Sequence, residues 1–139
     1  MFKIRYVSEL DKPFWFTLDE HLSEAEFMRK VRDKRGYVIC DEDKPIGVMR
    51  YNLFWDNTPF LTLIHLEEAS QRVGFGKQAM LCWENEMRAL GYQMVMTSTR
   101  VDEEAQHFYR KLGYKDKGGI CLDGTPMEQP QEVFMVKVL

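Results

Sequence analysis

The alternation of hydrophobic and polar residues predicts strands and helices along the whole chain. Residues 2–7 alternate as in a half-buried strand, and residues 23–34 place apolar side chains on one side of a helix that Ser23 caps. A broken helical region is expected between them. Residues 36–54 predict two strands joined by a tight turn, and the apolar run at 58–66 predicts a third strand covered on both faces.

The second half of the chain continues this pattern. Apolar residues at helical spacing predict a helix from about 76 to 90 that ends at Gly91, and another from about 102 to 112. Residues 93–99 predict a strand between these helices. Residues 118–138 predict two strands joined by a loop rich in glycine, proline and polar residues.

This order of elements predicts one α/β or α+β domain over residues 1–139. Its centre is a right-handed crossover from the strand at 58–66 to the strand at 93–99, through the helix that begins near Gly76. With 139 residues, of which 45% are hydrophobic, the chain is long enough to bury a substantial core.

Composition argues against several classes of partner. The formal net charge of −3 disfavours a dedicated binder of nucleic acid or of an anionic membrane, so we expect a small neutral or cationic partner instead. Cys40, Cys82 and Cys121 are widely spaced and form no C-x-x-C pair, which predicts no disulfide framework and no metal site. These features, with no apolar signal core and no membrane-length run, indicate a reducing cytoplasm.

The stretch "QRVGFGKQAM", residues 71–80, carries the clearest chemical signal. Gly74 and Gly76 stand directly before a helix, where glycine costs about 1 kcal/mol relative to alanine in the helix interior. A backbone that must approach a ligand closely explains such a pair. Free backbone N–H groups and the helix dipole form an anion site at that point, and we expect the anion to be a phosphate.

Two other phosphate motifs fit this stretch less well. "GFGKQA" matches the dinucleotide pattern G-x-G-x-x-A, but no carboxylate follows about 20 residues later to bind a ribose. A Walker loop requires Ser or Thr after Gly76-Lys77, where this chain has Gln78. Glycines that serve only the geometry of the turn remain an alternative.

Two motifs together resemble the GNAT family of N-acetyltransferases. "QRVGFG" resembles the family's [QR]-x-x-G-x-[GA] segment, and "AQHFYRKLGY" resembles its A-x-x-F-Y-x-K-x-G-[FY] helix. The close resemblance covers about residues 61–114, with one motif on each side of a strand.

The resemblance implies a GNAT-type fold, with a mixed, mostly antiparallel sheet, a splayed pair of parallel strands, and flanking helices. It implies acetyl-CoA, or coenzyme A, as co-substrate, with the pyrophosphate on the glycine loop and the pantetheine arm along the central strand near Leu66. The cofactor-binding residues implied are Leu66, Gln71, Arg72, Val73, Gly74, Phe75, Gly76, Lys77, Asp102 and Ala105.

Two positions depart from the family pattern. Arg72 stands where the family often has glycine, and its guanidinium could itself pair with a phosphate oxygen. Asp102 stands where the family favours asparagine. Because an ionised carboxylate cannot donate a hydrogen bond, Asp102 is also interpreted as a helix N-cap.

The implied chemistry is acyl transfer from a thioester to an amine. Tyr109 occupies the position where the family commonly has its general acid, although it also lies on an apolar helix stripe and could be a core residue. The central strand offers no carboxylate as base. His65 can serve instead, although a lone histidine in an apolar strand is more often a core residue.

The acceptor stays open among small amines, amino acids, amino sugars, polyamines and protein N-termini, with a small-molecule amine favoured. The aromatic residues at 13–16, with Tyr51, Phe54 and Trp55, favour an apolar body or a stacking cation if they line its pocket. The rival function is a non-catalytic acyl-CoA-binding or sensing module. A nicotinamide-dependent oxidoreductase is a third, and a homodimer stays open.

Overall fold

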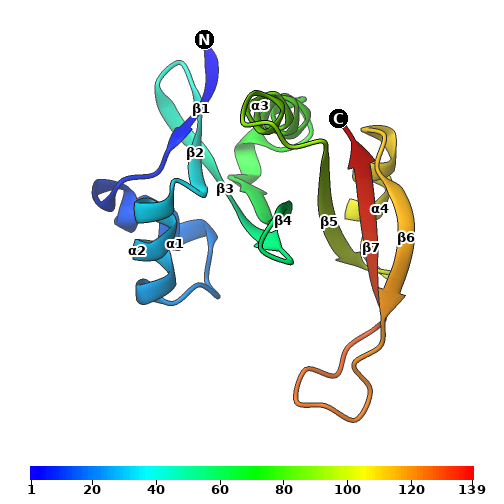
Figure 1. Cartoon of the computed structure of the whole chain (residues 1–139). Helices are drawn as coiled ribbons and strands as arrows, with labels where there is room; N and C mark the ends of the chain where they lie inside the picture. Colours follow the sequence, from blue (N-terminus) through cyan, green and yellow to red (C-terminus); the bar gives the residue numbers. More distant parts are fainter.

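Seven strands form one continuous sheet in the order β1-β2-β3-β4-β5-β7-β6 (Figure 1). The computed structural model describes all of residues 1–139. Every neighbouring pair is antiparallel except β4 and β5, which run parallel, so the predicted mixed, mostly antiparallel sheet is confirmed. The strands are β1 (Phe2–Tyr6), β2 (Gly36–Asp41), β3 (Lys44–Phe54), β4 (Thr58–Leu66), β5 (Met94–Arg100), β6 (Lys115–Ile120) and β7 (Glu132–Val138).

The helices fall close to the predicted ranges. Ser23 caps α2 as predicted, because its hydroxyl accepts a hydrogen bond from the Glu26 N–H at 3.1 Å. The last helix begins three residues later than expected, with Glu104 and not Asp102 at its N-cap. The helices are α1 (Lys12–Leu18), α2 (Glu24–Asp33), α3 (Phe75–Ala89) and α4 (Ala105–Lys111), with short 3-10 turns at Glu9–Asp11 and Glu68–Ser70.

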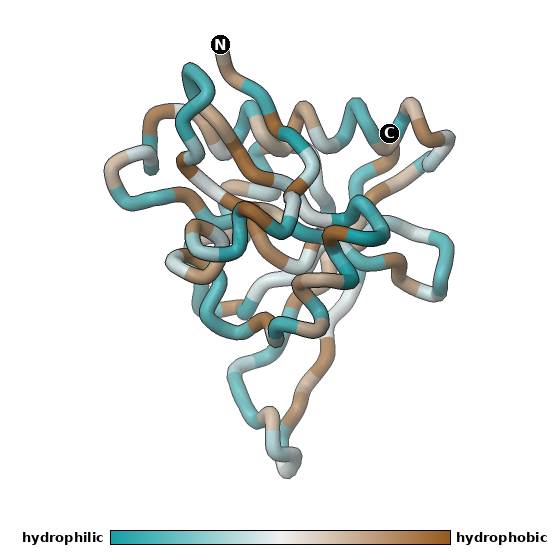
Figure 2. Tube along the Cα trace, turned by 90° about the vertical axis from the view of Figure 1, so that its left-hand side faces the viewer, coloured by the Kyte–Doolittle hydropathy of each residue, from teal (hydrophilic) through white to brown (hydrophobic).

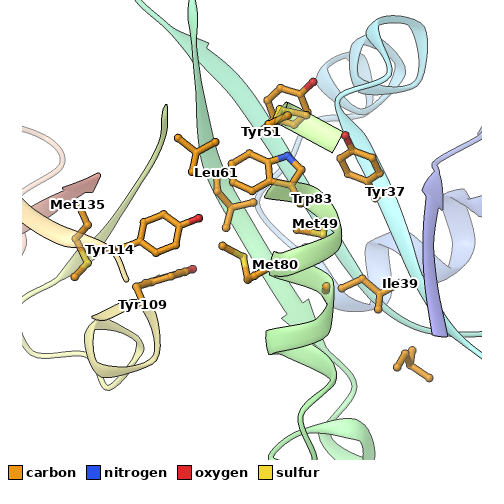
Figure 3. Close-up of a cluster of buried hydrophobic side chains, with 14 residues drawn as sticks. Tyr37, Ile39, Met49, Tyr51, Leu61, Met80, Trp83, Tyr109, Tyr114 and Met135 are labelled. Atoms are coloured by element: carbon orange, nitrogen blue, oxygen red, sulfur yellow. The ribbon is translucent and has the colours of Figure 1, made fainter. Parts of the chain in front are cut away.

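Each face of the sheet has its own hydrophobic core. On one face, α3 and α4 pack against the strands, and buried side chains such as Trp83, Met80 and Tyr109 fill the interface (Figure 3). On the other face, α1 and α2 cover β2 and β3 through Trp15 and Phe27, which are fully buried. Polar and apolar stretches alternate along α3, the helix at the top of Figure 2, as expected of a helix with one buried side.

The parallel strands β4 and β5 separate after a short contact. They pair only at Phe60 with Met96 and at Leu61 with Thr97, and beyond that point they diverge (Figure 1). The prediction that the strand at 58–66 is covered on both faces is therefore wrong for its second half. Ile64 and Leu66 stay partly exposed there because β5 has moved away from them.

The far edge of the sheet is polar. All six residues of β6 are exposed, and they include lysine and aspartate side chains that discourage pairing with another chain. Beyond β6, the segment 121–131 projects from the body of the molecule before β7 begins (Figures 1 and 2).

A buried carboxylate ties α3 to β7 and to the residue that precedes β6. Glu84 is completely buried; it accepts a hydrogen bond from the Tyr114 hydroxyl at 2.8 Å and pairs with the Lys137 ammonium at 2.7 Å. Burying an ion is costly unless it is paired, so this triad depends on all its members being present.

Removal of the cation tests that dependence. Lys137→Met should lower the free energy of unfolding by about 3–5 kcal/mol, because the Glu84 carboxylate stays buried without its countercharge. Urea denaturation measures the loss. Lys115→Met, on the exposed strand β6, is the matched control and should change stability by about 0.5 kcal/mol or less. Equal stabilities of the two variants would contradict the prediction.

Candidate active site

A cavity of about 600 Å³ opens where β4 and β5 diverge. Its walls come from the end of β4, the segment before α3, the first turn of α3, and α4. Nine of the twelve residues predicted for the site line it: His65, Leu66, Gln71, Arg72, Gly74, Gly76, Lys77, Ala105 and Tyr109. The structure therefore brings together residues from three separate parts of the sequence.

One wall of the cavity is an unpaired strand edge. The Glu67 N–H donates to the Ile46 carbonyl on β3 at 2.8 Å, and hydrogen-bonded and non-bonded pairs alternate along an antiparallel ladder. This alternation directs the backbone groups of Ile64 and Leu66 away from β3 and toward the gap. The Leu66 carbonyl accepts only from the Gln71 side chain, at 3.0 Å. A ligand in the cavity thus meets open backbone donors and acceptors.

The segment before α3 forms a second wall, and it is built of free N–H groups. None of the six consecutive backbone N–H groups from Arg72 to Lys77 donates a hydrogen bond within the protein. Arg72 and Gly74 have φ angles of 64° and 93°, so the chain bends through the left-handed region twice. Successive N–H groups in such a bend, at the positive end of a helix dipole, bind anions.

Two cations flank these N–H groups. The side chains of Arg72 and Lys77 are exposed at the cavity, and neither takes part in an ion pair of the molecule. Both are therefore free to meet a negatively charged ligand, and Arg72 can do so with two parallel hydrogen bonds.

Gly76 allows three elements to meet at the floor of the cavity. A Cβ built at this position would lie 3.4 Å from the Phe108 ring of α4 and 3.7 Å from the Leu66 side chain. A Cβ built at Gly74 would meet nothing within 4 Å. Glycine at this position therefore allows the left-handed φ angle and leaves the space above the backbone open.

Tyr109 lies at the inner end of the cavity. Its ring extends from α4 toward Met80 of α3 (Figure 3), and the residue is 7% exposed. Burial raises the pKa of the Tyr109 phenol to about 12, and the neighbouring Thr97 hydroxyl offsets part of this rise. The phenol therefore stays protonated at neutral pH and can act as a hydrogen-bond donor.

His65 lies on the opposite face of β4 from Leu66. It is exposed and not a core residue, and its Nδ1 lies 2.7 Å from the Leu18 carbonyl oxygen at the end of α1. Because a carbonyl can only accept, Nδ1 carries the proton in the neutral ring, and Nε2 keeps a free lone pair. This arrangement leaves the imidazole able to accept a proton at Nε2.

Three of the predicted residues lie outside the cavity lining. The Val73 side chain is 62% exposed, and Phe75 stacks on Phe2 with ring centroids 5.8 Å apart. The Asp102 carboxylate accepts two hydrogen bonds from the Arg100 guanidinium, at 3.0 and 2.8 Å, which lowers the pKa of that carboxyl. Asp102 is therefore neither the N-cap of α4 nor a wall of the cavity.

Two residues that line the cavity were not predicted as site residues. Phe108 was assigned to the apolar stripe of its helix, and helical spacing alone does not distinguish a core face from a cavity wall. Ile64 alternates with His65 along β4, so the sequence contains the signal that places it beside Leu66.

The remaining chemistry of the molecule is sparse. No group of three His, Cys, Asp or Glu side chains is arranged to hold a metal ion, and the three cysteines are free. None of the helices combines the length and the hydrophobicity needed to cross a membrane.

Several solved structures share this fold over nearly the whole chain. Ard1 from Thermoplasma volcanium superposes with a TM-score of 0.84 at 17% identity, covering 99% of this chain and 97% of that one. A ribosomal-protein-alanine N-acetyltransferase from Brucella melitensis gives 0.80 at 18% identity, covering 99% of each chain. A GNAT family acetyltransferase from Elizabethkingia anophelis with acetyl-CoA bound gives 0.79 at 15% identity, covering 99% and 98%.

The family assignment rests on a match in sequence. No curated protein matches the chain significantly in sequence. Residues 4–114, which run from within β1 through the glycine loop to the end of the α4 motif, match the sequence model of the Acetyltransferase (GNAT) family. The chain therefore belongs to the acetyltransferase (GNAT) family.

Proposed function

We propose that this protein transfers the acetyl group of acetyl-CoA directly to a primary amine. The observation that carries the proposal is the run of six free N–H groups from Arg72 to Lys77 beside the open edge of β4. An N-terminal helix site takes a pyrophosphate, and an open strand edge takes the amide groups of a pantetheine arm. The related structure from Elizabethkingia anophelis, which contains acetyl-CoA, supports this donor.

The donor is oriented by these two walls. The pyrophosphate lies on the N–H groups before α3, with Arg72 and Lys77 beside it. The pantetheine arm follows the edge at Leu66 and Ile64, and the thioester reaches the inner end near Tyr109. A backbone N–H of this edge then donates to the thioester carbonyl and stabilises the oxyanion that forms during attack.

The reaction then needs two proton movements. The neutral amine attacks the thioester carbon, the new C–N bond forms, and the C–S bond breaks to release the thiolate. Tyr109 donates a hydrogen bond, and then its proton, to the departing sulfur. The reacting centre lies near Leu61, and His65 lies about 13 Å along β4 from that residue. His65 is therefore too far away to meet the amine directly, and it accepts the amine proton at Nε2 through a chain of water molecules.

Coenzyme A binding tests the phosphate loop. Gly74→Glu should weaken the affinity for coenzyme A by at least about tenfold, because the carboxylate projects into the anion site. Calorimetry measures the change. Gly91→Glu is the matched control, since Gly91 has a φ of 94° and the same open space but lies at the other end of α3. Equal affinity of the two variants would remove the phosphate-loop interpretation.

Removal of a single hydroxyl tests the acid. Tyr109→Phe keeps the packing of the ring, so stability should change little. Because the variant lacks the proton donor, kcat should fall about 10²–10⁴-fold with little change in KM. The control is Tyr114→Phe, whose hydroxyl bonds to Glu84 away from the cavity and whose loss should affect stability and not kcat. A near-normal kcat in Tyr109→Phe would assign this residue to packing.

The pH dependence of turnover tests the base. His65→Ala should lower kcat more at low pH than at high pH, because at high pH the acceptor amine loses its proton without help. His107→Ala serves as the control, since His107 is exposed on α4 and pairs only loosely with Glu104 at 3.8 Å. If both variants keep the wild-type pH profile, His65 does not act as a base.

A panel of amines separates the enzyme from a sensing module. Release of free coenzyme A thiol in the presence of acetyl-CoA and an amine supports transfer. Tight binding of coenzyme A without turnover on any amine would instead identify a non-catalytic acyl-CoA-binding protein, which is the rival function.

A further inference from the structure

The carboxylate of Glu132 lacks a cationic partner in a setting that favours one. It is partly buried at the start of β7, and the Ser98 hydroxyl on β5 donates a hydrogen bond to it at 2.7 Å. It takes part in none of the molecule's ion pairs. A carboxylate that is partly removed from water and holds one hydrogen bond attracts a cation.

The nearest cation in the sheet is already engaged. Arg100 lies opposite Glu132 in the register of β5 and β7. Its guanidinium is held by the two oxygens of Asp102, at 3.0 and 2.8 Å, and lies 3.7 Å from Glu103. Arg100 also attracts Glu132, but its single positive charge is shared among three carboxylates, so this part of the sheet keeps a net negative charge.

Glu132 projects from the face of the sheet opposite α4. Thr97 and Met135 point toward the core under α3 and α4, so their neighbours in the strands, Ser98 and Phe134, point the other way. Glu132 lies two residues from Phe134 and shares its face. This part of the face is not covered by α1 or α2, which pack over β2 and β3.

A series of aromatic rings begins at Phe134, next to Glu132 on this face. Phe134 of β7 packs edge-on against Phe60 of β4 with ring centroids 5.8 Å apart, and Phe54 lies 6.1 Å from Phe60. Trp55, which is 81% exposed, extends the group from the β3–β4 turn, with its centroid 4.8 Å from that of Phe54. Aromatic rings beside a free carboxylate form a setting suited to an ammonium group with an apolar body.

The position in the sheet places this group one strand away from the reacting centre. The last paired residues of the parallel strands are Leu61 and Thr97, and the Thr97 hydroxyl donates to the Leu61 carbonyl at 3.0 Å. Tyr109 neighbours Thr97 from the α4 face. Ser98, one residue further along β5, is the first residue beyond the contact, and it bonds to Glu132 on the neighbouring strand β7. Glu132 therefore lies one strand away from the gap and on the opposite face of the sheet from Tyr109.

We propose that Glu132, oriented by Ser98 and lying beside Phe134, binds the protonated amine of the acceptor. The acceptor is then a primary amine with an aromatic or long apolar body. Its cationic form binds from the face opposite α4, and transfer follows once the proton has left. This inference rests on the proposed function, because it names the substrate class for that same site.

Binding of a charged probe and its neutral analogue tests the proposal. We use 2-phenylethylamine, which is an ammonium at pH 7, and 2-phenylethanol, with the protein saturated with coenzyme A, and measure both affinities by calorimetry. The wild-type protein should bind the ammonium about 10–100-fold more tightly than the alcohol. Glu132→Gln should remove this preference and leave the affinity for the alcohol unchanged.

The variants are chosen to keep the fold. The glutamine oxygen can still accept from Ser98, and coenzyme A binding in the same experiment verifies that the site is intact. Glu128→Gln, an exposed glutamate in the segment before β7, is the matched control and should keep the preference. Phe134→Leu should weaken the ammonium and the alcohol alike.

Two results would overturn the proposal: an undiminished preference for the ammonium in Glu132→Gln, or equal affinity of the wild-type protein for both probes. Failure of the proposed function is a separate result. It would appear as absence of coenzyme A binding, or as binding of coenzyme A without thiol release, whatever the two probes do.

Discussion

The early separation of β4 from β5 is the constraint on which the site depends. Two pairs join these parallel strands, and beyond Leu61 and Thr97 the edge of β4 faces a gap. Backbone N–H and C=O groups are obligatory hydrogen-bonding groups, so an unpaired strand edge in the middle of a sheet is stable only where water or a ligand can reach it. The cavity lies at that edge, and residues of the α3–α4 core, among them Leu66, Phe108 and Tyr109, line it.

The helix that crosses between these strands completes the site. Because α3 starts just after β4 ends, its free N–H groups and its dipole face the mouth of the gap. The left-handed conformation of Arg72 costs a non-glycine residue about 1–2 kcal/mol, yet it keeps a guanidinium where the family often has glycine. Strain of this kind at a ligand site is consistent with a functional constraint.

Local patterns predicted the elements and the glycine loop, because both depend on short-range spacing. The features that failed depend on partners far apart in the sequence. Asp102 was interpreted as a helix cap, but the Arg100 guanidinium binds its carboxylate and α4 begins later. The open half of β4 looked like a covered strand, since periodicity cannot report that a neighbouring strand diverges. Glu132 belongs to a predicted strand, and no local pattern indicates that the Arg100 guanidinium opposite it is shared with Asp102 and Glu103.

Tyr109, the proposed general acid, and the carboxylate of Glu132 lie on opposite faces of the sheet. Other tyrosines of the molecule show what happens when a phenol and a carboxylate meet. Where a tyrosine and a glutamate meet, they bond: Tyr6 and Tyr37 donate to Glu86, and Tyr114 donates to Glu84. Burial and these carboxylates raise the pKa of Tyr37 and Tyr114. The hydroxyl of such a tyrosine already donates its proton to a carboxylate in a hydrogen bond, so it cannot donate to another group. A carboxylate beside Tyr109 would capture its hydroxyl in the same way. Because β5 separates Glu132 from Tyr109, one face can hold an ammonium while the phenol on the other stays free to meet a departing sulfur.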